Sequence, residues 1–331
     1  MKARGLRAIL LLVLVVATIA LPTAVPAAPV PATTGVVEIE TRFQGGTGAA
    51  TGMVLTPSGE VLTNNHVIRG ATVIWVHVPR TGRVYRARVL GYSVSSDVAL
   101  LKVQGASGFR TVSLGNSSTA RVGDHVTAVG NAGGTGTLTT KVGTITGLGR
   151  TLTLRDEYGS TKRLTHLIGT SADLRRGDSG GPLLDDAGRV LGMNAAASFE
   201  LGMGSGESDG YAIPISRAMS IVSQIESGRA SASVHIGATP FLGVTVDTSP
   251  SSGTADGVRV ADVRVPSPAA RAGLAAGDVI VSLNGHAVRT PTRLVALLLR
   301  WHPGDNVRLA WRDELGSRRS AVVRLASGPP Q

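Results

Sequence analysis

The hydrophobic positions of this chain fall in short, partly alternating segments. From Val36 onward, segments such as VVEIETRF, ATVIWVHVP and DVALLKV are each bounded by Gly, Pro, Ser or Asn. Alternation of apolar and polar positions, interrupted by turn residues, is typical of half-buried strands joined by tight turns. The pattern therefore predicts a mainly β domain that begins at Val36.

Helical spacing is clearest in the segment SRAMSIVSQIESG, whose apolar residues recur at intervals of three and four. These residues are Ala218, Ile221, Val222 and Ile225. Gly228 stands where such a helix should end. We predict that this helix closes a first domain over residues 36–228, and that residues 229–240 (RASASVHIGATP) form a linker.

A second unit is expected over residues 241–325. It opens with FLGVTV, continues through a turn-rich stretch to AGLAAGDVIVSLNG, and ends in the strand-like SAVVRLA. The segment TPTRLVALLLRW predicts a helix, because Thr290 suits the N-cap and Pro291 the first helical position. The Asn-Gly pair in VSLNG predicts a hairpin turn.

The N-terminal segment has the pattern of a targeting signal. Basic residues precede an apolar run from Ala8 to Leu21, and small residues follow it. Residues 1–27 are therefore expected to be a signal peptide cleaved after Ala27, or an uncleaved membrane anchor, with residues 28–35 as a Pro-rich spacer. In either case the two domains would lie outside the cytoplasmic membrane.

Composition excludes several kinds of chemistry. The 331 residues include no cysteine, which rules out zinc-thiolate sites, iron–sulfur clusters and a thiol nucleophile. No metal or other cofactor is expected. The net charge of +11 comes from 33 basic and 22 acidic residues. The basic residues are scattered and are not interleaved with aromatic ones, so nucleic-acid binding is not expected.

Ser179 lies in LRRGDSGGPLLDDAGRVLGM, between an acidic residue and two glycines. A serine hydroxyl becomes a nucleophile only with a base, a carboxylate that orients the base, and donors for the developing oxyanion. His66 ends the strand-like segment of GEVLTNNHVIRGA, where a polar turn would expose its imidazole. Asp97 follows the polar turn SVSS and opens VALLKV; it is either a turn residue or the orienting carboxylate. The other histidines that stand out, at positions 77, 125, 235, 286 and 302, are expected to be solvated or satisfied in the core.

The segments TNNHV, DVALLKV and GDSGGPLLDDAGRVLGMN, in this order, resemble the chymotrypsin-like superfamily and specifically the HtrA (DegP/DegS-like) serine proteases. The resemblance extends from Val36 to Leu325. It implies a chymotrypsin-like double β-barrel followed by a small β-rich PDZ domain with two helices. It also implies that Ser179 attacks the scissile carbonyl, that His66 is the base and that Asp97 orients it. The backbone N–H groups of Gly177 and Ser179 would form the oxyanion hole.

Two acids depart from the HtrA pattern. Asp178 stands where that pattern usually has Asn, and we expect it to pair with Arg175 or Arg176 or to remain uncompensated in a loose loop. Asp173 lies six residues before Ser179, where an acid in the specificity pocket of digestive proteases selects Lys or Arg. The small aliphatic preference of HtrA enzymes is nevertheless favoured, with a pocket formed by Ala195, Ala196 and Tyr211.

The segments FLGVTV and SPAARAGLAAGDVIVSLNGHAV resemble a PDZ domain of the HtrA kind. Such a domain adds a peptide C-terminus to an edge strand and binds its carboxylate through loop N–H groups. The resemblance assigns the carboxylate-binding loop to Phe241, Leu242, Gly243 and Val244. It places Leu294, Leu297 and Leu298 on the helix beside the groove, although at least one of them is expected to belong to the core.

The leading hypothesis is an exported serine endopeptidase that hydrolyses unfolded or damaged envelope proteins, with the PDZ domain capturing peptide C-termini or regulating the site. The rival hypothesis is a non-proteolytic PDZ-bearing chaperone or stress sensor with a latent protease site. A third hypothesis, a basic protein that binds DNA or envelope polymers, predicts binding that depends steeply on salt. The resemblance also implies a homo-oligomer, a trimer.

Overall fold

The computed structural model describes residues 31–155, 161–195, 210–247 and 257–331. The expected signal segment, the first residues of the spacer, and Ala196 lie outside this part of the chain. Within the described residues, no helix is both long enough and apolar enough to cross a membrane.

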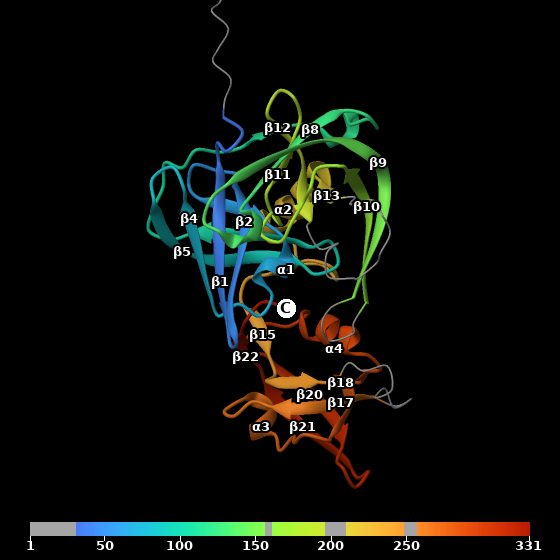
Figure 1. Ribbon diagram of the computed structural model, residues 1–331. Coiled ribbons are helices and arrows are strands. Elements are labelled where there is room, and N and C mark those ends of the chain that lie inside the picture. Colours follow the sequence, from blue (N-terminus) through green and yellow to red (C-terminus); the bar gives the residue numbers. More distant parts are fainter. Residues whose placement is uncertain (1–30, 156–160, 196–209, 248–256) are drawn as a thin grey trace, which may run out of the picture. The chain divides into compact units, whose positions relative to one another are not determined.

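Six strands of the N-terminal half close into a β-barrel (Figure 1). They are β1 (Val36–Phe43), β2 (Gly46–Val54), β3 (Glu60–Thr63), β4 (Val73–Val78), β5 (Arg83–Ser93) and β6 (Val98–Val103). Neighbours follow the order β5-β4-β1-β2-β3-β6, and β5 also pairs with β6, so the sheet closes on itself. Alternating residues of these strands, including Ile39, Val61 and Leu101, form its buried core.

A second set of six strands closes in the same way. They are β8 (His125–Gly130), β9 (Thr139–Arg155), β10 (Thr161–Thr170), β11 (Pro182–Leu184), β12 (Arg189–Ala195) and β13 (Gly210–Pro214). The order is β11-β8-β9-β10-β13-β12, and β11 also pairs with β12. The short β7 (Ser113–Leu114) adds a parallel edge to β12. Two such barrels in succession are the chymotrypsin-like arrangement, so the fold expected for this half is confirmed.

Short helices connect and flank the barrels. They are α1 (Asn65–Ile68), the 3₁₀ turns η1 (Ser117–Thr119) and η2 (Ala132–Gly134), and α2 (Ile215–Glu226). The predicted closing helix is α2, whose predicted apolar residues are all buried. Gly228 follows it with φ +68°, a conformation that suits glycine and ends a helix. The linker contributes β14 (His235–Ile236), which pairs with β5.

The C-terminal unit is a small β-rich domain with two helices, as expected (Figure 1). Its strands are β16 (Val244–Val246), β17 (Val258–Val263), β18 (Val279–Leu283), β19 (His286–Ala287), β20 (Asn306–Arg312) and β21 (Arg318–Arg324), and its helices are α3 (Pro268–Arg271) and α4 (Pro291–Leu298). Thr290 caps α4, since its side chain accepts the Arg293 N–H at 3.1 Å. Asn284 and Gly285 both have positive φ, which forms the predicted hairpin turn between β18 and β19.

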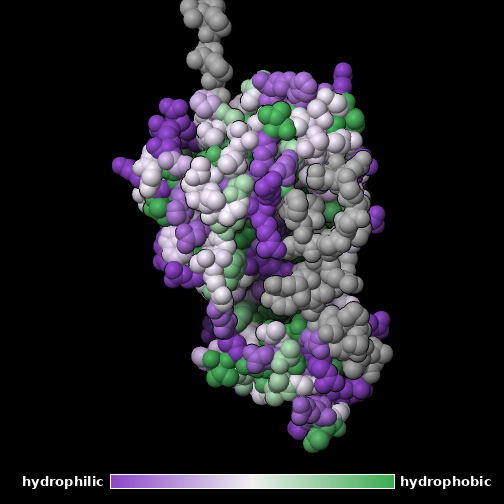
Figure 2. All heavy atoms as spheres, in the orientation of Figure 1, coloured by the Kyte–Doolittle hydropathy of each residue, from purple (hydrophilic) through white to green (hydrophobic). Residues whose placement is uncertain are grey.

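One strand pairing extends beyond the predicted limits of this domain at both ends. A strand β15 (Thr239–Phe241), which begins in the expected linker, pairs antiparallel with β22 (Ala326–Gly328), which follows the predicted last residue. Exposed apolar side chains, such as Val142 and Leu315, are dispersed along the chain. On the face drawn in Figure 2, apolar side chains lie in small groups among hydrophilic ones.

Candidate active site

His66 and Asp97 are held together by two hydrogen bonds. Nδ1 of His66 lies 2.7 Å from Oδ2 of Asp97, and the His66 backbone N–H donates to Oδ1 at 3.0 Å. Asp97 is fully buried, and the Asn64 side chain donates to its backbone carbonyl at 3.1 Å. An ionised carboxylate only accepts hydrogen bonds, so the ring proton lies on Nδ1 and Nε2 is left as the basic nitrogen.

The histidine is carried by a helix and not by the polar turn that the sequence suggested. β3 ends at Thr63, Asn64 is extended, and α1 begins at Asn65. The His66 side chain stays 36% exposed, whereas its helical neighbours Val67 and Ile68 are buried. The short helix therefore anchors its apolar side in the first barrel and leaves the imidazole accessible.

The loop that carries Ser179 comes from the second barrel and packs against the first. The Ser179 carbonyl accepts the Thr51 N–H at 2.9 Å, and Thr63 donates its hydroxyl to the Thr51 carbonyl at 2.8 Å. A Cβ on Gly180 would lie 2.1 Å from the Thr51 oxygen and 2.3 Å from the Thr63 hydroxyl. Only glycine permits this approach, which brings Ser179 beside the strand that leads to His66.

Gly177 has a conformation and surroundings that also require glycine. Its φ is +97°, and a Cβ there would lie 1.9 Å from the carbonyl oxygen of Asn131. Thr51 donates its hydroxyl to the Gly177 carbonyl at 2.7 Å, and the Gly133 N–H donates to the carbonyl of Arg176 at 2.7 Å. The peptide groups on both sides of Gly177 are therefore held by fixed partners.

Comparison with known proteins agrees with this geometry. A family model for a trypsin-like peptidase domain matches residues 50–193, and one for a PDZ domain matches residues 240–313. A probable periplasmic serine endoprotease, DegP-like, of Pseudomonas savastanoi pv. phaseolicola is 35% identical over 85% of this chain and 56% of its own length. The serine protease PepD of Mycobacterium tuberculosis is 32% identical over 88% of this chain and 63% of its own length. The solved structure of the HtrA-type protease AlgW with a tripeptide has a TM-score of 0.51 at 28% identity, covering 90% of this chain and 95% of that one.

The chain combines a trypsin-like peptidase domain with a PDZ domain and is similar to the HtrA-type serine proteases. It spans 56% and 63% of the lengths of the two curated relatives just described.

The acid before Ser179 departs from the pattern expected of the HtrA proteases. The Asp178 carboxylate is 1% exposed and contacts the ammonium of Lys141, while the backbone N–H of Arg175 donates to Oδ2 at 2.7 Å. The expected pairing with the Arg175 guanidinium is wrong, because that group binds Asp173 at 2.6 and 2.9 Å. An uncompensated Asp178 is also ruled out by the contact with Lys141.

The residues expected to form the specificity pocket lie in different settings. Asp173 is 51% exposed, and the hydrogen bond from Arg175 lowers the pKa of its carboxyl. Ala195 of β12 is fully buried and pairs with the half-buried Tyr211 of β13, while Ala196 lies outside the described residues. The choice between a small aliphatic and a basic P1 residue therefore stays a prediction.

The candidate peptide groove of the PDZ domain combines core residues with an edge strand. Leu242 is buried, and Gly243, with φ +86°, could not carry a Cβ, which would lie 2.3 Å from Ser267. Val244 opens β16, which pairs with β17 alone among the described strands and lies at the end of the sheet order. On α4, Leu294 and Leu297 belong to the domain core, and Leu298 packs against it partly exposed. Phe241 lies in β15, with the Arg264 guanidinium 5.9 Å from its ring centre.

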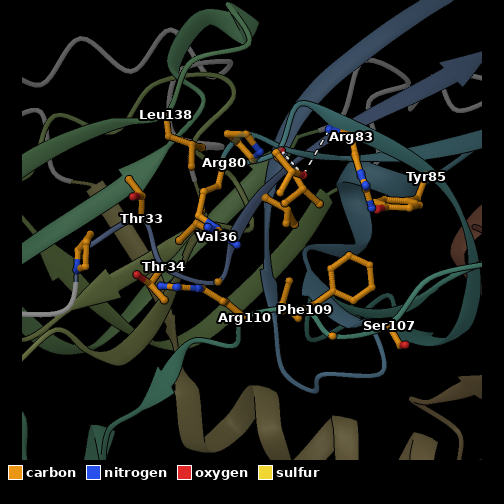
Figure 3. Close-up of a pocket in the computed structure, with 18 residues that line it drawn as sticks. Thr33, Thr34, Val36, Arg80, Arg83, Tyr85, Ser107, Phe109, Arg110 and Leu138 are labelled. Atoms are coloured by element: carbon orange, nitrogen blue, oxygen red, sulfur yellow. Dashed lines mark hydrogen bonds between the residues drawn. The ribbon is translucent and has the colours of Figure 1, made fainter.

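A hollow of about 430 Å³ lies away from these residues, around the start of β1 (Figure 3). Tyr85 and Phe109 contribute aromatic rings that pack edge to face at 5.5 Å, and three arginines, Arg80, Arg83 and Arg110, also line it. None of His66, Asp97 or Ser179 lines this hollow. Among the described residues, no group of three or more His, Asp or Glu side chains is placed to hold a metal ion.

Proposed function

We propose that this chain is an exported serine endopeptidase that hydrolyses peptide bonds of unfolded or damaged proteins of the cell envelope. The observation that carries the proposal is the double hydrogen bond from His66 to Asp97, at 2.7 and 3.0 Å. It lies where the loop of Ser179 packs against the strand leading to His66. Buried carboxylate, oriented imidazole and serine are the three groups that acyl transfer to a hydroxyl requires.

In the proposed reaction, Ser179 Oγ attacks the scissile carbonyl carbon and passes its proton to Nε2 of His66. The resulting imidazolium is stabilised by the Asp97 carboxylate, which keeps its own charge. The N–H groups of Gly177 and Ser179 donate to the oxyanion of the tetrahedral intermediate. His66 then returns the proton to the leaving amine, and water hydrolyses the acyl-enzyme with His66 again as base.

The PDZ domain is proposed to bind the C-terminal residues of polypeptides, either to capture substrates or to regulate the site. The free edge of β16 can accept an extended peptide as an additional antiparallel strand. Residues 241–244 would bind the terminal carboxylate, and Leu298 is the partly exposed α4 side chain available to the groove. Leu294 would support that wall from within the core.

Location is proposed from the relatives, and assembly from the sequence resemblance to the HtrA proteases alone. Several curated relatives are described as periplasmic endoproteases, including a DegP-like protein of Halomonas elongata and DegQ of Escherichia coli. We place this chain outside the cytoplasmic membrane, as a homo-oligomer, with residues 1–27 acting as its signal or anchor.

The test is the cleavage of fluorescently labelled casein by the wild-type chain and by Ser179→Ala, together with labelling by a fluorophosphonate probe. Cleavage and labelling that both disappear in Ser179→Ala are the expected result. Prevention of casein aggregation by both proteins, with neither cleavage nor labelling, would support the chaperone alternative. Binding to DNA or to an anionic polymer that falls steeply with salt and is unaffected by Ser179→Ala would support the third hypothesis.

A further inference from the structure

A carboxylate is buried directly before the proposed nucleophile. One oxygen of Asp178, Oδ2, contacts Lys141 Nζ and accepts the Arg175 backbone N–H. The other, Oδ1, is buried with no hydrogen-bond partner among the described residues, and a Cβ on Gly130 would lie 2.4 Å from it. Burying an ionised carboxylate is unfavourable without an opposite charge close by. The ammonium of Lys141 supplies that charge.

Lys141 is largely shielded from solvent, unlike the apolar residue that follows it in the strand. Its side chain is 15% exposed, whereas the next residue of β9, Val142, is 78% exposed. Adjacent strand residues point to opposite faces, so β9 directs the lysine inward and the valine outward. This reverses the usual preference of both residue types, and the contact with Asp178 explains it.

The same Asp178 carboxylate also closes the turn that contains Gly177. Arg175 donates its N–H to the Asp178 side chain at 2.7 Å, and the Asp178 N–H donates back to the Arg175 carbonyl at 3.0 Å. The orientation of the Asp178 carboxylate therefore determines the path of residues 175–178. The two proposed oxyanion donors, the N–H groups of Gly177 and Ser179, lie within and directly after this turn.

We propose that Lys141 is a positioning residue of the protease site: its ammonium holds Asp178, and through it the oxyanion-binding turn, in the conformation for reaction. This inference rests on the proposed function. Without the ammonium, the buried Asp178 carboxylate loses the opposite charge beside it and is expected to turn toward solvent, which weakens its hydrogen bond to Arg175. Because the donors act on the transition state, kcat should fall while KM for a peptide changes little.

Four variants test the proposal. Lys141→Met removes the charge and keeps the aliphatic length, Lys141→Arg keeps the charge, and Lys141→Met/Asp178→Asn removes both charges. The double variant leaves no unpaired buried charge, because both charged groups are removed. Its new Asn side-chain oxygen can still accept the Arg175 N–H. The matched control is Lys102→Met, because Lys102 lies in the other barrel, 3.9 Å from the Glu60 carboxylate.

The readouts are the rate of Ser179 labelling by a fluorophosphonate, kcat and KM for casein peptides, and the thermal midpoint. Lys141→Met should lower the labelling rate and kcat by about 10- to 100-fold, part of the loss expected when an oxyanion donor is removed. Lys141→Arg should restore part of the rate, and the double variant should label near the wild-type rate. Lys102→Met should match the wild type in labelling.

Wild-type rates in Lys141→Met would overturn the proposal. So would a double variant that is folded by circular dichroism but labels no faster than Lys141→Met. If Lys141→Met fails to fold, the comparison is with the wild type: a folded double variant that labels more than tenfold more slowly than the wild type would then overturn the proposal. Failure of the proposed function is distinguishable: the wild type and Ser179→Ala would then behave alike in labelling and cleavage, and this inference would fall with it.

Discussion

Replacement of Gly177 by alanine tests the geometry of the proposed oxyanion hole most directly. The added Cβ would lie 1.9 Å from the Asn131 carbonyl oxygen, and must retreat to ordinary contact at 3.4 Å, a movement of about 1.5 Å. Alanine is also strained at φ +97°, by about 1–3 kcal/mol. A hydrogen bond is lost over such a displacement, since N–H to oxygen distances vary only by about 0.5 Å. Loss of one oxyanion donor lowers kcat by about 10²–10³, which corresponds to about 2.7–4 kcal/mol.

The assay measures kcat and KM for casein-derived peptides in Gly177→Ala and in a matched control, Gly188→Ala. Gly188 has φ +73° in an exposed hairpin turn, and a Cβ there meets nothing within 4 Å. Both variants carry the strain of alanine at positive φ, but only the first carries the clash. A Gly177→Ala protein that is folded and keeps kcat within tenfold of Gly188→Ala would refute the assignment of this turn to the oxyanion hole.

Two further changes test the base and the buried acids. Asp97→Asn should lower kcat by about 10⁴-fold without unfolding the protein, because an amide facing Nδ1 favours the tautomer whose proton lies on Nε2. The test is to measure kcat of the variant and of the wild type between pH 6 and 9. A variant kcat within tenfold of the wild-type value would contradict the role of Asp97. Burial raises the pKa of the Glu38 carboxyl above its ordinary value of 4.5, so the folded state holds the proton more tightly than the unfolded state. The stability of the fold therefore falls as pH rises from 4.5 through the raised pKa. Glu38→Gln should therefore stabilise the protein more at pH 7 than near pH 4; urea denaturation of both proteins that gives the same difference at the two pH values would count against it.

Short sequence patterns were sufficient to locate the helices and turns that depend on only a few consecutive residues. The i, i+3, i+4 spacing located α2, the Thr290-Pro291 pair located the start of α4, and Asn284-Gly285 located a hairpin turn. The pairing of His66 with Asp97 was expected from motif order and is observed at 2.7 Å. In each case the signal lies in a few consecutive residues, or in a resemblance that supplies the long-range contact.

Short elements and contacts between segments far apart in the sequence could not be predicted from such patterns. Helix α1 has only four residues, too few for a helical period to show. Strand β22 pairs with β15 across more than eighty residues, so neither segment alone indicates its partner. The expected limits of the second domain, residues 241–325, therefore exclude β22 and include only the last residue of β15.

The partner of Asp178 shows why side-chain pairing across a barrel is difficult to predict. By proximity in sequence, Arg175 and Arg176 are the obvious candidates, and a lysine beside Val142 in a strand is the residue expected to face water. The register of β9 on β8, which sets Lys141 opposite Ala128, decides otherwise, because a slip of one residue would turn the lysine outward and the valine inward. That register is maintained by the whole ladder from His125 to Gly130, whose last residue packs on Asp178. The register of the second barrel therefore places the charge that compensates Asp178. Lys141→Met removes that charge without changing the loop of Ser179, so it tests this contribution of the barrel more directly than a substitution in the loop.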